Sequence, residues 1–158
     1  MVILKDDPKD PICEVELNIE SVTEQSVAFH ICFRSGHIFP TVQSKRIRCL
    51  KEDFLEMLSD LKQLNNTHLS MLEHKDPGLC IYHIPHFGTY YYPTHGFFVP
   101  DKVCVSECQY TLIFVLDAGE MNHLRATGNG PALCLKVNME QINEFSESLA
   151  HQVNSFEL

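Results

Sequence analysis

The residues of this sequence that could most readily bind a metal are three histidines in the segment YHIPHFGTYYYPTHGF, residues 82–97. A zinc site needs nitrogen or sulfur ligands that converge on one ion. On an extended strand, His83 and His86 would point to opposite faces, and Pro85 lies between them and bends the chain. We therefore predict no metal at His83, His86 and His95, and a metal-dependent hydrolase that uses them is kept as an alternative function.

Cysteine and serine chemistry is no better supported by the sequence. Cys104 and Cys108 would share a strand face but lie about 13 Å apart at ~3.3 Å per residue, too far to hold one ion. The chain has no Gly-x-Ser-x-Gly elbow, no cysteine-peptidase signature, and no glycine pattern of a P-loop or dinucleotide site. The sequence thus predicts a protein that is not an enzyme and has no cofactor.

The cysteines also indicate a compartment. There are seven of them, an odd number, and four lie in apolar stretches that are typical of strands: Cys13, Cys32, Cys80 and Cys134. This placement favours buried free thiols in a reducing environment over a set of disulfides. The start of the chain is not typical of a signal peptide, and no apolar stretch approaches the ~20 residues of a membrane helix. We expect a cytoplasmic protein without a membrane partner.

The charge pattern argues against direct binding of nucleic acid. The formal net charge is −9, and residues 1–24 carry seven acids against only Lys5 and Lys9. Nucleic-acid affinity comes largely from cationic surface, and the one basic cluster, SKRIRCLK at residues 44–51, is too short and isolated to supply it. An acidic surface can serve solubility alone, or it can form a face that attracts a basic protein partner.

Two alternating segments predict a hairpin that displays the acids. Apolar and polar residues alternate over 13–20 and again over 27–33, as in strands with one buried face. Glu14, Glu16 and Glu20 should therefore form an outward row. If Val27 pairs with Ile19, then Glu16 lies opposite His30.

Helical spacing appears in two other places, about 52–65 and 139–155. The expected apolar stripes are Phe54, Leu58, Leu61 and Leu64 in the first helix, and Ile142, Phe145, Leu149, Val153 and Phe156 in the second. Asn138 and Gln141 have the spacing of a capping box. Because the remaining segments are strand-like and adjacent in sequence, we predict one α+β domain over 1–158. Its largely antiparallel sheet should have about six or seven strands, with both helices packed on one face.

Three consecutive tyrosines follow the first two histidines. Tyr90 and Tyr92 would share one strand face and Tyr91 the other, so one face must expose aromatic area unless the strand is buried on both sides. Tyrosine suits protein interfaces because its ring packs while its hydroxyl stays hydrated. The alternative is that these rings pack within the fold, and the sequence does not choose between the two.

Several segments together resemble the WapI-type bacterial immunity proteins, which are antidotes of polymorphic toxins. They are the helix EDFLEMLSDLKQL, the strand GLCIYHI, the aromatic strand that ends at Phe98, the stretch YTLIFVLDAGEMNHL and the closing helix INEFSESLA. The resemblance runs from about Glu52 to the C-terminus and concerns structural pattern, not catalytic residues. It implies a cytoplasmic, non-enzymatic protein that binds and neutralises the toxic domain of a cognate secreted or polymorphic toxin.

Toxins of this kind are frequently nucleases and often basic, which suits an acidic antidote. The candidate partner-binding residues are Glu14, Glu16, Glu20, His86, Tyr90, Tyr92 and His95. An adaptor or chaperone that keeps a secreted effector soluble would have the same general features, and this alternative stays open.

Overall fold

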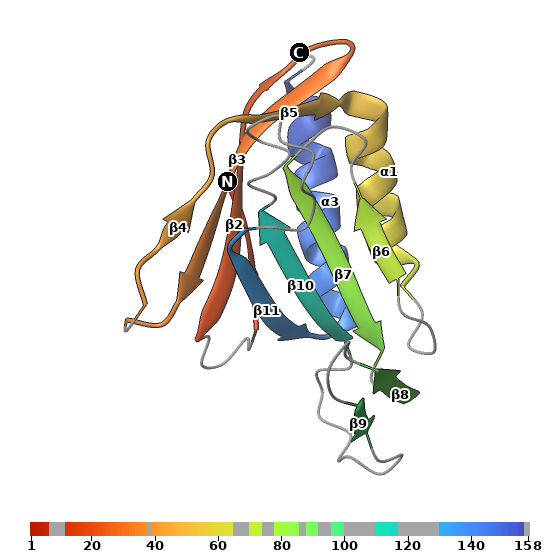
Figure 1. The fold of residues 1–158 in the computed structure, drawn as a ribbon. Coiled ribbons are helices and arrows are strands. Elements are labelled where there is room, and N and C mark those ends of the chain that lie inside the picture. The colour runs from red at the N-terminus through yellow and green to blue at the C-terminus, as the bar shows by residue number, and fades with distance from the viewer. Residues whose placement is uncertain are drawn as a thin grey trace.

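The parts of the chain that the structure describes fold into antiparallel strands and two helices, as seen in a computed structural model (Figure 1). The structure describes residues 1–6, 12–37, 39–64, 70–73, 78–85, 88–91, 96–99, 110–116 and 130–156. Its elements are β1 (Val2–Lys5), β2 (Cys13–Val22), β3 (Ser26–Ser35), β4 (Val42–Gln43), β5 (Ile47–Leu50), α1 (Lys51–Lys62), β6 (Ser70–Glu73), β7 (Leu79–Pro85), β8 (Gly88–Tyr91), β9 (Gly96–Val99), β10 (Tyr110–Leu116), β11 (Ala132–Val137) and α3 (Met139–Ser155). The α+β class is therefore confirmed.

The strands form more than one sheet, so the prediction of a single sheet of six or seven strands is wrong. The first sheet has the order β1-β2-β3-β4, with β5 also paired to β3, and the second has the order β11-β10-β7-β6. A separate pair is formed by β8 and β9. The division falls at α1 in the sequence, because the strands before this helix pair in the first sheet and the strands after it pair only with one another.

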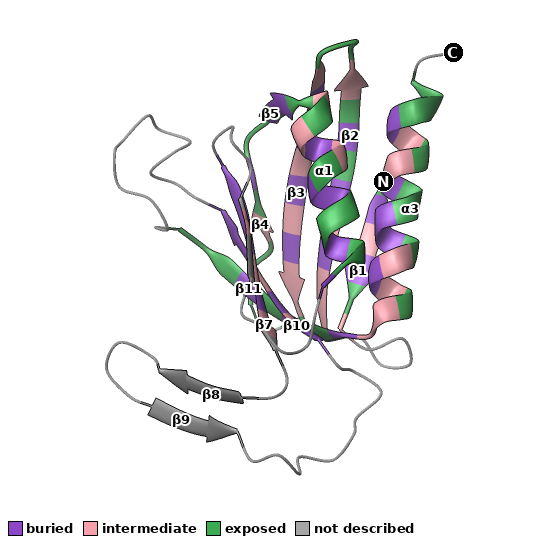
Figure 2. Ribbon diagram, turned by 90° about the vertical axis from the view of Figure 1, so that its right-hand side faces the viewer, coloured by how far each residue is buried: buried purple, intermediate pink, exposed green. Residues whose placement is uncertain are grey.

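One core lies between the sheets and the helices. In Figure 1, β7 and β10 lie in front of α3, and after the 90° turn of Figure 2, α1 lies in front of β2 and β3 while α3 lies beside it, next to β1. Buried side chains from both sheets and both helices join one cluster. Its fully buried large members include Phe29, Phe54, Phe114, Leu17, Ile31, Leu58, Leu61, Leu79, Ile81, Leu112, Leu135 and Ile142. The apolar stripes of the helices thus face the apolar faces of the strands, as amphipathic elements require.

The β2–β3 hairpin has the predicted faces but a different register. Ile19 lies opposite Phe29, not Val27, and Glu16 lies opposite Cys32, so His30 faces Asn18. The strands continue closer to their connection than the alternation suggested, and the pairing shifts between Ile19 and Ser21. Because the alternation has a period of two, these shifts change which residues meet but leave the buried and exposed faces as predicted.

Both helices carry the predicted stripes, and the larger deviations are at their ends. All four predicted residues of the first stripe are buried, although the last of them, Leu64, lies beyond the end of α1. In α3, Ile142, Phe145, Leu149 and Val153 are buried. Phe156 is exposed because it follows the last helical residue, so its assignment to the stripe is wrong. No helix in the described parts of the chain is long and apolar enough to cross a membrane.

Hydrogen bonds join the first residues of α3 to one another and to β1. The Asn138 side chain accepts a hydrogen bond from the Gln141 backbone amide at 2.8 Å, and the Gln141 side chain accepts one from the Asn138 amide at 2.9 Å. This confirms the capping box. The Gln141 Nε2 group also donates to the Lys5 carbonyl at 2.9 Å. One side chain thereby links the helix start to β1.

The strand β1 was not predicted from the sequence pattern. Val2 and Leu4 are buried, whereas Ile3 and Lys5 point to the other face and are more exposed. A four-residue strand contains only two inward positions, which is too little for periodicity to identify on its own. This strand forms one edge of the first sheet.

Candidate protein-binding surface

The outward side of the first sheet carries an ordered set of charged side chains. Glu14, Glu16 and Glu20 come from β2 and project on the same side as His30 and Arg34 of β3, because alternate residues of paired strands share a face. Arg46, from the connection between β4 and β5, completes the set. We call these six residues the charged face. The predicted placement of the three glutamates on one face is confirmed.

At one end of the charged face, Arg34 bridges two glutamates. Its Nη1 lies 2.8 Å from Glu14 Oε1, and its Nη2 lies 2.6 Å from Glu16 Oε2. The Glu16 side chain is only 15% exposed, whereas that of Arg34 is 42% exposed. The hydrogen bond with Glu14, followed by the charge of Glu16, raises the pKa of Arg34 above its usual value. The guanidinium is therefore a fixed cation between two carboxylates.

At the other end, Glu20 is held by two partners. One carboxylate oxygen lies 2.9 Å from His30 Nε2 and the other lies 3.1 Å from Arg46 Nε. His30 is oriented through its Nδ1, which lies 3.2 Å from the Ser44 carbonyl, and Arg46 Nη2 donates to Ser21 Oγ at 2.8 Å. The three glutamates are thus each paired within the protein. The surface is an alternating pattern of charges and not the uniformly acidic row that the sequence suggested.

A thiol lies next to residues of the charged face. Cys32 is half-buried on β3 and lies opposite Glu16 on one side and Gln43 on the other. Burial is the main cause that raises the pKa of Cys32, Arg34 lowers it, and Glu16 and Glu14 raise it further. The net effect keeps the thiol protonated at neutral pH. Because the thiolate is the nucleophile, Cys32 is poorly suited to nucleophilic catalysis.

The environment of Cys32 predicts how its alkylation should respond to mutation. Glu16→Gln removes a negative charge that raises the pKa of Cys32, so iodoacetamide should modify Cys32 faster at pH 8. Arg34→Gln removes the charge that lowers this pKa, so modification should become slower. Peptide mass spectrometry can follow Cys32, with the exposed Cys134 of the same samples as the internal reference. Equal Cys32 rates in Glu16→Gln and the parent protein would contradict this electrostatic account.

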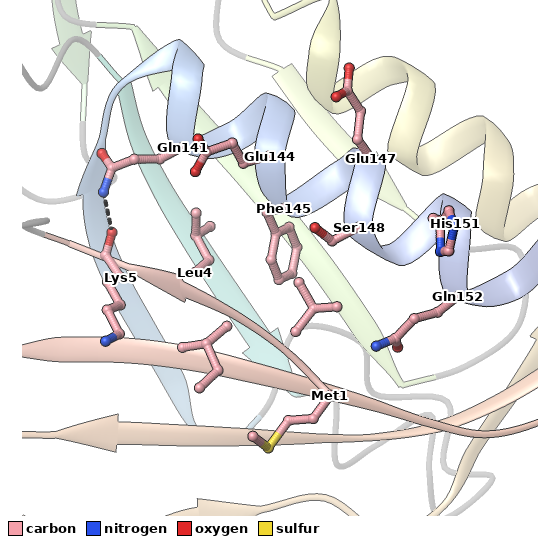
Figure 3. A pocket seen from close by; sticks show the side chains of 12 residues that line it. Met1, Leu4, Lys5, Gln141, Glu144, Phe145, Glu147, Ser148, His151 and Gln152 are labelled. Atoms are coloured by element: carbon pink, nitrogen blue, oxygen red, sulfur yellow. Dashed lines mark hydrogen bonds between the residues drawn. The ribbon is translucent and has the colours of Figure 1, made fainter.

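Beside the charged face, β1 and α3 line a groove of about 920 Å³ (Figure 3). The buried Phe145 contributes to its wall, and Glu144, Ser148, His151 and Gln152 line it from α3. The Gln141–Lys5 hydrogen bond spans one end of the groove. Met1 lies at the other end, near Gln152 in the figure.

Of the histidine and tyrosine candidates, His83 is the one whose side chain the structure describes. His83 is fully buried, with its ring centroid 5.6 Å from that of Tyr110, so it belongs to the core. Tyr90 lies on β8 opposite Phe97, but its side chain is outside the described residues. His86, Tyr92 and His95 also fall outside them. Within the described residues, no group of three His, Cys, Asp or Glu side chains could hold a metal ion.

The cysteines are less uniformly buried than predicted. Those in the described parts of the chain form no disulfides, and Cys49 and Cys80 are buried. Cys13 and Cys32 are half-buried, and Cys134 is exposed because it lies on the outward side of β11, where alternate residues are exposed. Cys104 and Cys108 lie outside the described residues. The expectation of free thiols thus holds for the described cysteines, whereas the expectation of burial is wrong for three of them.

Sequence reasoning found the acids of the charged face but missed their partners. The same alternation, continued along the second strand, also places Arg34 outward, so the position of Arg34 could have been predicted from the sequence. Arg46 had no such signal, because it lies in a connection and reaches Glu20 only in the folded chain.

Comparisons with protein-family models, with curated proteins and with solved structures find no match for this chain.

Proposed function

We propose that this chain is a non-enzymatic inhibitor of the immunity type, which binds and neutralises the toxic domain of a cognate secreted or polymorphic toxin in the cytoplasm. The proposal follows the resemblance to WapI-type immunity proteins. The observation that carries it is the charged face, in which ion pairs hold Glu14, Glu16, Glu20, His30, Arg34 and Arg46 on and beside two paired strands. Its pre-formed ion pairs suit recognition, and burial raises the pKa of the nearby Cys32 thiol, which disfavours the nucleophilic thiolate.

Pre-formed ion pairs favour specific binding for two reasons. Side chains that are already ordered lose less conformational entropy when a partner docks. A fixed alternation of charges also accepts a complementary pattern and rejects partners that place like charges opposite it. The charged face is therefore better suited to selecting one partner than to attracting any cation.

The net charge of −9 supplies the long-range attraction to a basic partner. In this proposal the charges set the rate of encounter and its dependence on salt, whereas aromatic anchors set the rate of dissociation. Tyr90 and Tyr92, together with His86 and His95, are the proposed anchors, because tyrosine contributes a large ring and a hydroxyl to an interface.

The test measures binding of the purified chain to the cognate toxin domain by surface-binding kinetics at two salt concentrations. Glu14→Lys with Glu16→Lys should slow association about tenfold at low salt and less at high salt. Tyr90→Ala or Tyr92→Ala should instead speed dissociation. The matched control is Glu52→Lys with Glu56→Lys, which makes the same charge change at exposed positions of α1.

Two results would count against the proposal. If the charged-face variant and the α1 control bind with the same kinetics, the charged face is not the interface. If the chain binds the toxin domain tightly but the toxin stays active in the complex, the chain is an adaptor or chaperone and not an inhibitor. A toxicity assay in cells that express both proteins separates these two functions.

A further inference from the structure

The outer edge of β1 has backbone groups that point away from its sheet. The Asp6 amide donates to the Cys13 carbonyl at 3.0 Å, so Asp6 and Cys13 form a hydrogen-bonded pair of the antiparallel ladder. Such pairs alternate along the strand, which places Leu4 and Val2 in the ladder and turns Ile3 and Lys5 to the open side. The bond from Gln141 Nε2 to the Lys5 carbonyl confirms this direction. No residue in the described part of the chain pairs with the Ile3 amide and carbonyl on that side.

The groove runs along this open edge. All of residues 1–5 line it, and the opposite wall comes from α3 (Figure 3). An added strand would continue the first sheet past β1 and rest one of its faces on α3. Four residues of such a strand span about 13 Å. The groove volume of about 920 Å³ lies near the upper end of the range of ligand pockets, roughly 300–1,000 Å³.

The wall provided by α3 is acidic. Between Met139 and Phe156 the chain has Glu140, Glu144 and Glu147 but no lysine or arginine. Glu147 is paired with Lys62 of α1 at 3.0 Å, whereas no described residue pairs with Glu144, which lines the groove. The last turn of α3 also lacks a basic residue, so the negative end of the helix dipole is not compensated there.

We infer that the edge of β1 binds an extended, lysine- or arginine-rich segment of a partner protein by strand addition. Backbone hydrogen bonds to Ile3 would hold the segment, and its basic side chains would face Glu144 and the end of α3. The edge is continuous with the charged face, because Ile3 lies opposite Glu16 and Lys5 lies opposite Glu14. The inference rests on the proposed function only in that the partner is a protein.

A second copy of this chain suits the edge less well. Two copies that pair antiparallel through their β1 edges are related by a two-fold axis perpendicular to the joined sheet. That symmetry places the two α3 helices on the same face of the sheet and next to each other. Each helix carries the same acidic residues and no basic ones, so the contact would be repulsive.

The decisive variant is Ile3→Pro. Proline removes the amide that points to the open side, and it removes no ladder bond because the Ile3 amide is not in the ladder. Ile3→Val keeps the amide and is the matched control. The probe is a fluorescein-labelled Lys-Val-Lys-Val-Lys-Val-Lys peptide with blocked ends, and the comparison probe replaces each lysine with glutamate.

Fluorescence anisotropy should show that the lysine peptide binds the parent and Ile3→Val similarly, and Ile3→Pro about tenfold or more weakly. The glutamate peptide should bind the parent at least about tenfold more weakly than the lysine peptide. Hydrogen exchange of the Ile3 amide, followed by NMR on the parent protein, should slow about tenfold or more when the lysine peptide is bound. This last measurement decides the matter even if Ile3→Pro fails to fold.

The inference is overturned if the lysine peptide does not bind the parent, or if it binds and leaves the exchange of the Ile3 amide unchanged. The toxin domain separates this failure from that of the proposed function. If folded Ile3→Pro binds the toxin domain like the parent while the charged-face variant does not, the proposed function stands and strand addition is wrong. If the lysine peptide protects Ile3 but no toxin domain binds, strand addition stands and the proposed function is wrong.

Discussion

Replacing Phe54 with alanine should lower the free energy of unfolding by about 3–5 kcal/mol. Phe54 is fully buried in α1, and its ring centroid lies 5.4 Å from that of Phe29 on β3. The substitution removes buried apolar area and the contact between the two rings. It also leaves a cavity wherever the neighbouring side chains do not move in to fill the space. Because small domains are stable by only about 5–15 kcal/mol, this variant should be close to unfolding at room temperature.

The matched control for this prediction is Phe156→Ala. The Phe156 side chain is 49% exposed beyond the end of α3, so its removal should change the free energy of unfolding by less than about 0.5 kcal/mol. Urea titrations of both variants, followed by circular dichroism, give the two values from the midpoint and slope. Equal losses in the two variants would show that α1 does not pack on the first sheet as described.

Replacing Arg34 with glutamate should cost about 2 kcal/mol of stability and make the remainder depend on salt. The change removes the cation that contacts Glu14 and Glu16 and puts a third carboxylate beside them. Glu16 is mostly shielded from solvent, so it cannot easily recover the lost interaction from water. The value is well below the Coulomb energy of charges in contact, because Arg34 is 42% exposed and solvent screens it.

Three comparisons make this prediction specific. Arg34→Gln removes the ion pairs without adding a charge, so it should cost about half as much. Arg48→Glu makes the same charge change at an exposed position of β5 and should cost less than about 0.5 kcal/mol. In 1 M NaCl the difference between Arg34→Glu and Arg34→Gln should shrink, because the screening length falls to ~3 Å. If Arg34→Glu and Arg48→Glu lower stability equally, the bridge has no energetic role.

Hydrophobic periodicity predicted those parts of the fold in which a strand or helix buries one of its faces. The alternation of β2 and β3 and the stripes of α1 and α3 are of this kind, and the structure confirms their buried faces. The separation into sheets was beyond this reasoning, because a strand with one buried face looks the same in either sheet. The register of the hairpin was also missed, since it depends on where the connection begins and on the shift after Ile19.

The charged face shows the same limit at the level of single contacts. The sequence predicted where Glu14, Glu16 and Glu20 point, because that depends only on their own strand. Their pairing depends on residues that become neighbours through folding: Arg34 through the register, and Arg46 through the path of a connection. A sequence therefore shows which side of a strand a residue faces more readily than which residues it pairs with.

Because α3 contacts β1 and β2, the first sheet stays partly uncovered during synthesis until α3 has been made. A ribosome releases the β2–β3 hairpin early, but the helix that covers it is synthesised after every strand of both sheets. Until α3 emerges, the nascent chain carries an uncovered apolar surface that includes Val2 and Leu4, and such surfaces promote aggregation. The core can therefore be completed only once α3 has been synthesised. Slow translation of α3 would lengthen the time during which the apolar surface is exposed.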